Sequence, residues 1–181
     1  DDGTLVFEHA SGTMIYFSDS IRGTGSLVKR GASVLVLGGR NSYTGTTTVS
    51  GGKLVVTGAL GGTSVSVANG ASLGGTGSVA GSVSIASGGT LDPGEHDKAG
   101  VLRTGALTIA SGGRASFRIG TDSNHVAVGG NLAISGAISL QAGSGIKEGT
   151  YTLFTGKGTI SIDGATIDSV PYGYKATLGT T

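Results

Sequence analysis

The sequence predicts an all-β solenoid, a parallel β-helix, and three observations support this fold class. Glycine makes up 37 of the 181 residues, about three times its usual share, and 37% of the residues are nevertheless hydrophobic. Apolar and polar residues alternate along many short segments. A glycine-rich peptide also recurs at a nearly constant step, ending at Leu54, Leu73 and Leu91. A repeat unit of about 20 residues cannot bury its own apolar face, so stacked units must share one core.

Composition excludes several other classes of protein. The net charge is only +1 and the hydrophobic content is high, which argues against disorder. Glycine follows no period of three and there are only 2 prolines, which excludes collagen. With no cysteine, the chain has neither disulfides nor cysteine-bound metals. Because the chain starts and ends inside patterned sequence, with no signal peptide at its polar start, we expect it to be part of a longer protein.

Alternation of apolar residues marks the expected strands in chain order. Apolar residues two positions apart, with serine, threonine, alanine or charge between or beside them, indicate strands with one buried face. No apolar stripe of helical period lasts three turns. The pairs are Leu5 and Phe7, Leu35 and Leu37, Val65 and Val67, Val83 and Ile85, Leu107 and Ile109, Val126 and Val128, Leu132 and Ile134, and Ile138 and Leu140.

The recurring peptide sets the expected turn length. It reads SGGKL to Leu54, NGASL to Leu73, SGGTL to Leu91 and SGGRASF to Phe117, so the first two steps are nearly equal and the third is longer. We interpret the longest step as a turn with a polar loop inserted over residues 93–103. The alternating pairs keep a step similar to the first two, from Val65 to Val83 and from Leu107 to Val126. About eight or nine rungs are expected, with strands stacked ~4.8 Å apart.

Residues 41–56, NSYTGTTTVSGGKLVV, combine threonines with a tyrosine ahead of a valine-rich strand. Threonine is a good strand former, and we expect Thr44 and Thr46–Thr48 on an outward face. We expect Tyr43 to fill the core rather than to contact a ligand.

Motifs that resemble catalytic or metal sites are weak here. GASLG at 70–74 and GTGSVA at 75–80 match a nucleophile elbow around Ser72 and a dinucleotide loop, but both motifs require a following helix that this pattern excludes. Val79 stands where a calcium-binding repeat needs aspartate. Glu95, His96 and Asp97 are consecutive, so we expect a solvated loop. The sequence therefore predicts no catalytic residue, cofactor or metal.

Basic residues gather in a span that lacks acids. Residues 20–91 contain no aspartate or glutamate but hold Arg22, Lys29, Arg30, Arg40 and Lys53. Residues one turn apart stack in a solenoid, so some of these could form a basic stripe that attracts an anionic partner such as a sulfated glycan. The alternative is a solvated basic face without a partner.

Residues 23–56, GTGSLVKRGASVLVLGGRNSYTGTTTVSGGKLVV, resemble the passenger-associated transport repeat of bacterial autotransporters. The one visible departure is Thr46, where the family often has a second glycine. GGTLDPG at 88–94, GVLRTGALTIASGG at 100–113 and FRIGTDSNHVAVGGNLAISGAISL at 117–140 resemble later rungs of such passengers, although Ser123-Asn124-His125 replaces the usual Ser-Asp. YTLFTGKGTI at 151–160 and VPYGYKATL at 170–178 resemble passenger ends. The positions on the repeat pattern are Gly23, Gly25, Leu27, Lys29, Gly31, Leu35, Leu37, Asn41, Tyr43, Thr44, Gly45, Thr47, Val49, Gly52 and Leu54.

The resemblance implies a single right-handed parallel β-helical passenger fragment over residues 1–181. Its C-terminal rungs, residues 100–178, are expected to be the most stable part and to promote folding outside the cell. The family is exported across the outer membrane by its own C-terminal barrel, which implies a location at the bacterial surface or in the medium.

The expected function is that of a non-enzymatic adhesin or virulence factor that binds a protein or glycan receptor on a host or neighbouring cell. A sulfated glycan is one expected partner, and nucleic acid is not. The alternative is a structural stalk for an upstream protease or esterase domain. A polysaccharide lyase is disfavoured because residues 20–91 lack acids.

Overall fold

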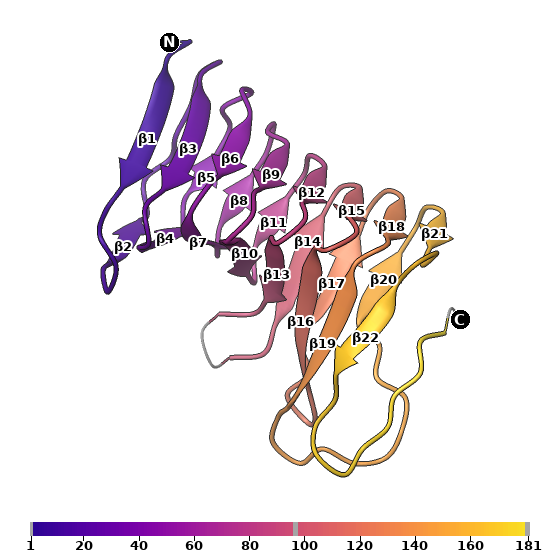
Figure 1. Ribbon diagram of the computed structural model, residues 1–181. Helices are drawn as coiled ribbons and strands as arrows, with labels where there is room; N and C mark the ends of the chain where they lie inside the picture. The colour runs from indigo at the N-terminus through magenta and orange to yellow at the C-terminus, as the bar shows by residue number, and fades with distance from the viewer. Residues whose placement is uncertain (1, 96–97, 180–181) are drawn as a thin grey trace.

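The computed structural model describes residues 2–95 and 98–179, which form a coil of short parallel strands (Figure 1). The strands belong to three sheets that run along the coil, here named A, B and C. Within the described residues there is no helix, and hence none that could cross a membrane.

Each sheet takes one strand from nearly every turn of the coil. Sheet A consists of β1 (Thr4–Glu8), β3 (Ser26–Arg30), β6 (Thr47–Val49), β9 (Val65–Val67), β12 (Val83–Ile85), β15 (Leu107–Ile109), β18 (Leu132–Ile134) and β21 (Ile160–Ser161). Sheet B consists of β2 (Met14–Phe17), β4 (Val34–Leu37), β7 (Gly52–Val56), β10 (Ala71–Gly75), β13 (Thr90–Pro93), β16 (Arg114–Ile119), β19 (Ala137–Ala142) and β22 (Thr166–Ser169). Sheet C consists of β5 (Arg40–Asn41), β8 (Ala59–Leu60), β11 (Ser78–Val79), β14 (Val101–Thr104), β17 (His125–Val128) and β20 (Phe154–Gly156).

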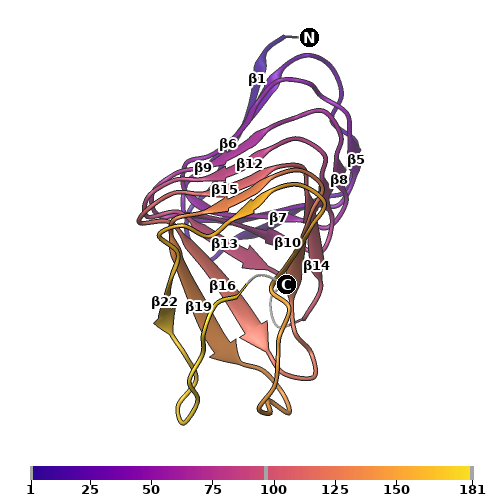
Figure 2. The same cartoon turned by 90° about the vertical axis from the view of Figure 1, so that its right-hand side faces the viewer.

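The chain visits the sheets in the order A, B, C and then repeats. All named strand pairs are parallel, and every pair joins consecutive turns, such as β6 to β9 and β7 to β10. Sheets A and B have eight strands each and sheet C has six, so six turns contain all three strands and the first and last turns contain two. Figure 2, turned by 90° from Figure 1, looks toward the C-terminal end of the coil and shows the three sheets around a common interior. The predicted all-β parallel solenoid is therefore confirmed.

Like residues stack in columns, as the recurring peptide predicts. Leu54 pairs with Leu73, and Leu73 with Leu91, in one file along sheet B. All three side chains are fully buried. The same column continues in both directions through Ile15, Leu35, Ala115, Ile138 and Ile167. The nearly constant step of the peptide thus gives the true register of these turns.

The later register differs from the sequence-based expectation. Leu91 faces Ala115 rather than Phe117, and Phe117 pairs with Leu140. Leu107 pairs with Leu132 in sheet A, whereas Val126 belongs to sheet C. Both errors have one cause, because the turns after β13 are longer and the step of the earlier turns does not apply to them.

The expected inserted loop at 93–103 is also too long. Val101–Thr104 form β14 of sheet C, so only the part between β13 and β14 leaves the coil. The Asn124 side chain holds this insertion, because its Nδ2 donates to the carbonyl of Pro93 at 2.5 Å and its Oδ1 accepts from the Arg118 amide at 2.8 Å.

The fully buried core extends from Leu27 to Leu140. Described residues before Leu27 and after Leu140 are half-buried or exposed, since a terminal turn has a neighbour on one side only. Half-buried apolar side chains, among them Tyr151, Leu153 and Phe154, pack on the C-terminal end of the core. The expected greater stability of residues 100–178 stays a prediction.

A cavity in the middle of the leucine column should lower the stability of the fold. Leu73→Ala removes a fully buried side chain between Leu54 and Leu91, and should lower the free energy of unfolding by about 2–5 kcal/mol. Urea denaturation followed by circular dichroism measures this value. Ser72→Ala, on the opposite face of the same strand, should cost less than about 1 kcal/mol. Equal losses for the two variants would contradict the stacked interior.

Candidate functional site

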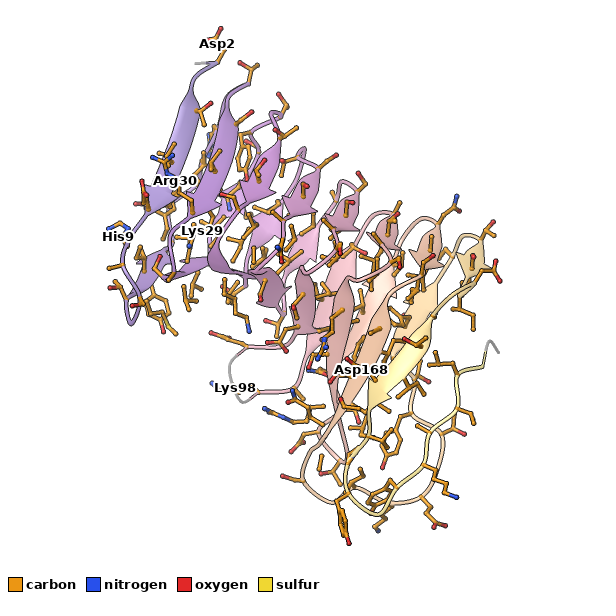
Figure 3. All side chains as sticks on the ribbon, viewed as in Figure 1. Asp2, His9, Lys29, Arg30, Lys98 and Asp168 are labelled. Carbon is orange, nitrogen blue, oxygen red and sulfur yellow. The ribbon has the colours of Figure 1, made fainter. Side chains whose placement is uncertain are left out.

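The basic residues singled out in the sequence come from the first three turns of the coil. Arg22 lies between β2 and β3, Lys29 and Arg30 lie on β3, Arg40 on β5 and Lys53 on β7. Lys29 and Arg30 are neighbours near the N-terminal end (Figure 3), but alternation along the strand sends their side chains to opposite faces. The five residues therefore do not form one surface stripe.

Lys29 is an interior residue with no solvent-exposed surface. It occupies a column of sheet A between Phe7 and Val49. Its Nζ donates to three backbone carbonyls, those of Arg30 at 3.0 Å, Gly31 at 2.8 Å and Gly51 at 3.0 Å. The ammonium thus joins two successive corners of the coil. An external anion cannot reach it, which corrects the expectation that Lys29 contributes to a surface site.

Gly52 provides the space for this ammonium. Its φ is +65°, and a Cβ built there would lie 2.8 Å from Lys29 Nζ and closer still to the carbonyl oxygen of Ser33. Any side chain at position 52 would therefore displace the lysine or the backbone. Two residues of the transport-repeat pattern, the lysine and this glycine, are in this way parts of one packed arrangement.

Arg30 is paired with an acid of the adjacent turn, and Lys53 with an acid two turns further along the coil. Arg30 Nη2 lies 2.8 Å from Glu8 Oε2, and Lys53 Nζ lies 2.5 Å from Asp92 Oδ2. Both acids lie outside the acid-free span 20–91, and stacking of the turns brings them to the basic residues. These exposed or half-exposed pairs add little stability, but they neutralise two of the charges of the expected stripe.

Besides the ion-paired Arg30, Arg22 and Arg40 are the exposed members of the set. Consecutive turns place them close in the fold, because Ile21 lies against Asn41: the amide of Ile21 donates to Asn41 Oδ1, and the amide of Ser42 donates to the carbonyl of Ile21, each at 2.9 Å. No ion pair to either arginine occurs within residues 2–95 and 98–179. Each guanidinium borders a shallow open depression, Arg40 beside Ser42 and Thr57, and Arg22 beside Ser26.

Asn41 is buried beneath this pair and ties three turns together. Besides accepting from Ile21, its side chain donates through Nδ2 to the carbonyl of Gly39 at 3.0 Å and to that of Ala59 at 3.2 Å. The next turn of sheet C places Leu60 at the same column position. The asparagine thus starts the interior column of sheet C by satisfying backbone groups that an apolar residue could not.

Tyr43 is 2% exposed, which confirms the expected core position. Its hydroxyl lies 2.6 Å from Thr47 Oγ1, which in turn lies 2.8 Å from Thr63 Oγ1. The Thr63 hydroxyl donates to the carbonyl of Ser64 at 3.1 Å. Thr47 is therefore buried in the column between Leu27 and Val65, and the prediction that it faces outward is wrong. Its hydroxyl is needed inside as the partner of the tyrosine.

The weak catalytic and metal motifs gain no partners in the fold. Ser72 lies on β10, with Lys53 and Thr90 as its register neighbours in sheet B. Of the expected solvated loop, Glu95 pairs through its backbone with Lys98, while His96 and Asp97 lie outside the described residues. Among the residues that the structure describes, no three of His, Asp or Glu come together in a way that could hold a metal ion.

Comparison with known proteins identifies one matching family and two relatives. Residues 27–56 match the family described as passenger-associated transport repeat. The chain is 38% identical over 167 residues to the adhesin BmaC autotransporter of Brucella suis biovar 1 (strain 1330), an alignment that covers 84% of this chain. It is also 52% identical over 42 residues, 23% of its length, to the autotransporter lipoprotein NalP of Neisseria meningitidis serogroup B (strain ATCC BAA-335 / MC58). The alignments span 5% and 4% of these relatives.

The buried lysine predicts a loss of stability on removal of its charge. Lys29→Met keeps the volume in the column but leaves the carbonyls of Arg30, Gly31 and Gly51 without the ammonium. We expect the free energy of unfolding to fall by about 2–4 kcal/mol in urea titrations. Lys175→Met, the same change at an exposed position, should stay within about 0.5 kcal/mol of the wild type. A silent Lys29→Met would show that the three hydrogen bonds have no net value.

The tyrosine predicts a pH dependence of opposite sign to that of the lysine. Burial raises the pKa of Tyr43 above its usual 10.0, although its hydrogen bonds with Thr47 and Thr63 act the other way. The unfolded chain therefore loses the phenol proton first, and stability falls as the pH rises above 10. Burial lowers the pKa of Lys29 below its usual 10.5, so the lysine contributes stability that rises with pH toward 10.5.

Tyr43→Phe isolates the first of these effects. Unfolding free energies of the wild type and of this variant, measured between pH 8 and 11, should differ by about 1–2 kcal/mol at pH 8. The difference should shrink above pH 10. A constant difference would mean that the phenol does not change its protonation between the folded and unfolded states.

Proposed function

We propose that this chain is part of a non-enzymatic adhesive passenger. The premise is that it carries a passenger-associated transport repeat within an autotransporter-type β-solenoid. The observation that carries the proposal is the similarity to a relative named as an adhesin, which extends over 84% of this chain. The chain spans only about one twentieth of that relative's length, so the proposal concerns the adhesive role of this segment.

The shape of the fold supports adhesion over catalysis. The molecule presents long sheet faces along a coil, with shallow open depressions beside Arg22 and Arg40. An enzyme needs a nucleophile, an acid or base and a partner that orients it, held together in a cleft. The polar groups that the coil does enclose, Lys29, Asn41 and Tyr43, are occupied by structural hydrogen bonds. An extended surface suits the engagement of a receptor.

Export to the bacterial surface or release into the medium belongs to the same proposal. Both relatives are named as autotransporters. In such a protein, a C-terminal barrel in the outer membrane would carry this segment outward. The absence of cysteine suits a chain that crosses a membrane before it folds, because no disulfide could form on the way.

The receptor is a protein or a glycan of a host or neighbouring cell, and Arg22 and Arg40 favour an anionic glycan. Both guanidinium groups are exposed on adjacent turns beside hydroxyl-bearing side chains. Guanidinium groups bind sulfate or carboxylate groups through paired hydrogen bonds. Of the five basic residues first considered, these two remain as the binding pair.

A second candidate function is that of a structural stalk for an upstream enzymatic domain. The observation that favours it is the 52% identity to NalP over 42 residues, a stretch that covers 4% of that relative. Relatives that carry different names thus share sequence with this chain. The polar residues of its transport repeat have structural partners here, as expected for a module that supports other parts of a passenger.

Adhesion of coated beads distinguishes the two functions. Beads that carry the purified chain should attach to cultured epithelial cells. Attachment should fall several-fold after heparinase treatment of the cells or with added heparin. It should also fall at 0.5 M NaCl, because salt screens exposed charges. Arg22→Ser with Arg40→Ser should reduce attachment to a similar extent. Lys147→Ser with Lys157→Ser, which removes the same charge near the C-terminal end, should leave it unchanged.

Each outcome of the bead assay has a distinct meaning. Attachment that ignores heparinase and the arginine variants would retain the adhesin but reject the sulfated glycan. Absence of attachment by the folded chain, verified by circular dichroism, would contradict the adhesin and favour the stalk.

A further inference from the structure

The outward face of sheet A is an uninterrupted array of short uncharged side chains. On β6, β9, β12, β15 and β18 the residues that face inward are buried, and the central residue between them faces outward. Register pairing aligns these outward residues in one column: Thr48, Ser66, Ser84, Thr108 and Ala133. A second column, just before the strands, contains Thr46, Ser64, Ser82, Ala106 and Asn131, whose carbonyls accept from amides of the preceding turn.

No charged side chain interrupts this face over five strands. The sequence has no Asp, Glu, Lys or Arg in residues 41–52, 54–91, 104–113 or 126–146, which contain all five strands. Charges occur toward the two ends of the sheet, in the Glu8–Arg30 ion pair on β1 and β3 and at Asp163 after β21. We name this surface, the two columns on β6 to β18, the hydroxyl face; it lies along one side of the coil (Figure 1).

The hydroxyl face is open to solvent. Ser64, Ser66, Ser82, Ser84 and Thr108 are exposed, and no segment of the described chain covers them. One hydrogen bond links two of the hydroxyls along a column, from Ser82 Oγ to Ser64 Oγ at 3.2 Å. The others retain donors and acceptors for an external partner.

We propose that the hydroxyl face binds the same face of a second copy of this chain. A hydroxyl both donates and accepts, so an array of serines and threonines is complementary to itself in either orientation. The face has no charge, and two copies therefore meet without repulsion between like charges. The rows recur at the strand spacing of ~4.8 Å, and a second parallel solenoid is the partner whose rows recur at the same interval.

Other classes of partner fit this face less well. It lacks aromatic rings on which sugars could stack and charges that would attract a polyanion, and Arg22 and Arg40 lie elsewhere, on the side of sheet C. A membrane would need an apolar surface, and these columns are mainly hydroxyl. Close packing of short side chains between two sheets is instead the arrangement that serine- and alanine-rich sheets adopt when they stack ~10 Å apart.

The area predicts a weak individual contact. Five strands at ~4.8 Å and a width of about five residues give roughly 400 Å² per copy, or about 800 Å² in total. Stable interfaces bury about 1,200–2,000 Å², so this contact should have a Kd in the high micromolar to millimolar range. Many copies displayed side by side would strengthen it through multivalency. A role of this interface in contact between neighbouring cells rests on the proposed surface display. The association of two purified chains does not depend on that proposal.

Sedimentation equilibrium of the purified chain between 20 µM and 2 mM tests the proposal. We expect a reversible monomer–dimer equilibrium that 0.5 M NaCl does not weaken. Ser66→Lys with Ser84→Lys should raise the Kd at least about tenfold, because lysines on both copies would face one another. Ser42→Lys with Thr155→Lys, equal in charge and exposed but outside the hydroxyl face, should leave the Kd unchanged.

A disulfide test supplements this measurement, since the chain has no cysteine of its own. Under mild oxidation Ser84→Cys should form a disulfide-linked dimer faster than Thr155→Cys. A wild type that stays monomeric to 2 mM, equal effects of the two lysine pairs, or equal rates of cross-linking would overturn the proposal. None of these results depends on bead attachment or on Arg22 and Arg40, so failure here is distinguishable from failure of the adhesin proposal.

Discussion

The structure depends on backbone pairing between consecutive turns, which places like side chains in continuous interior columns. Each strand has only two to six residues and could not bury a core alone. Stacking resolves this, because each inner residue is covered by residues of the turns before and after it, as Leu73 is by Leu54 and Leu91. The terminal turns have one neighbour each, and there the side chains remain half-buried or exposed. The whole fold is thus a repetition of nearest-neighbour contacts.

The interior of the transport repeat contains several hydrogen-bonded polar side chains beside its apolar ones. Lys29, Asn41, Tyr43 and Thr47 all point inward, and each has hydrogen-bond partners in other turns or on facing side chains. Register fixed by apolar columns alone can slip, whereas a buried polar group without its partner costs about 1–3 kcal/mol. We therefore interpret the repeat as the segment that sets the register of the coil. Its outer surface, with Arg22 and Arg40, and the hydroxyl face of sheet A remain free for other molecules.

Much of the fold could be predicted from the sequence, and the errors have physical causes. The nearly equal steps of the glycine-rich peptide predicted the column of Leu54, Leu73 and Leu91, because those turns have almost constant length. Phe117 and Leu107 were placed in the wrong register because loop length varies without changing the coil. Lys29 and Thr47 were expected outside, since residue type usually reports burial. The alternation along the strands instead predicts that both side chains point inward, because Lys29 follows the buried Leu27 by two positions and Thr47 precedes the buried Val49 by two. The pairing of Lys53 with Asp92 needed the three-dimensional register.

Distances between spin labels along one column test the stacked coil most directly. With the chain free of cysteine, labels at Thr48 and Ala133, or at Thr48 and Ser161, report separations of four and five turns. Double electron–electron resonance should give backbone separations of about 19 and 24 Å. The second distance should thus exceed the first by only about one strand spacing, although a complete extra turn of the chain lies between Ala133 and Ser161. Broad distributions, or an increment much longer than one strand spacing, would contradict a coil in which every turn rests on the last.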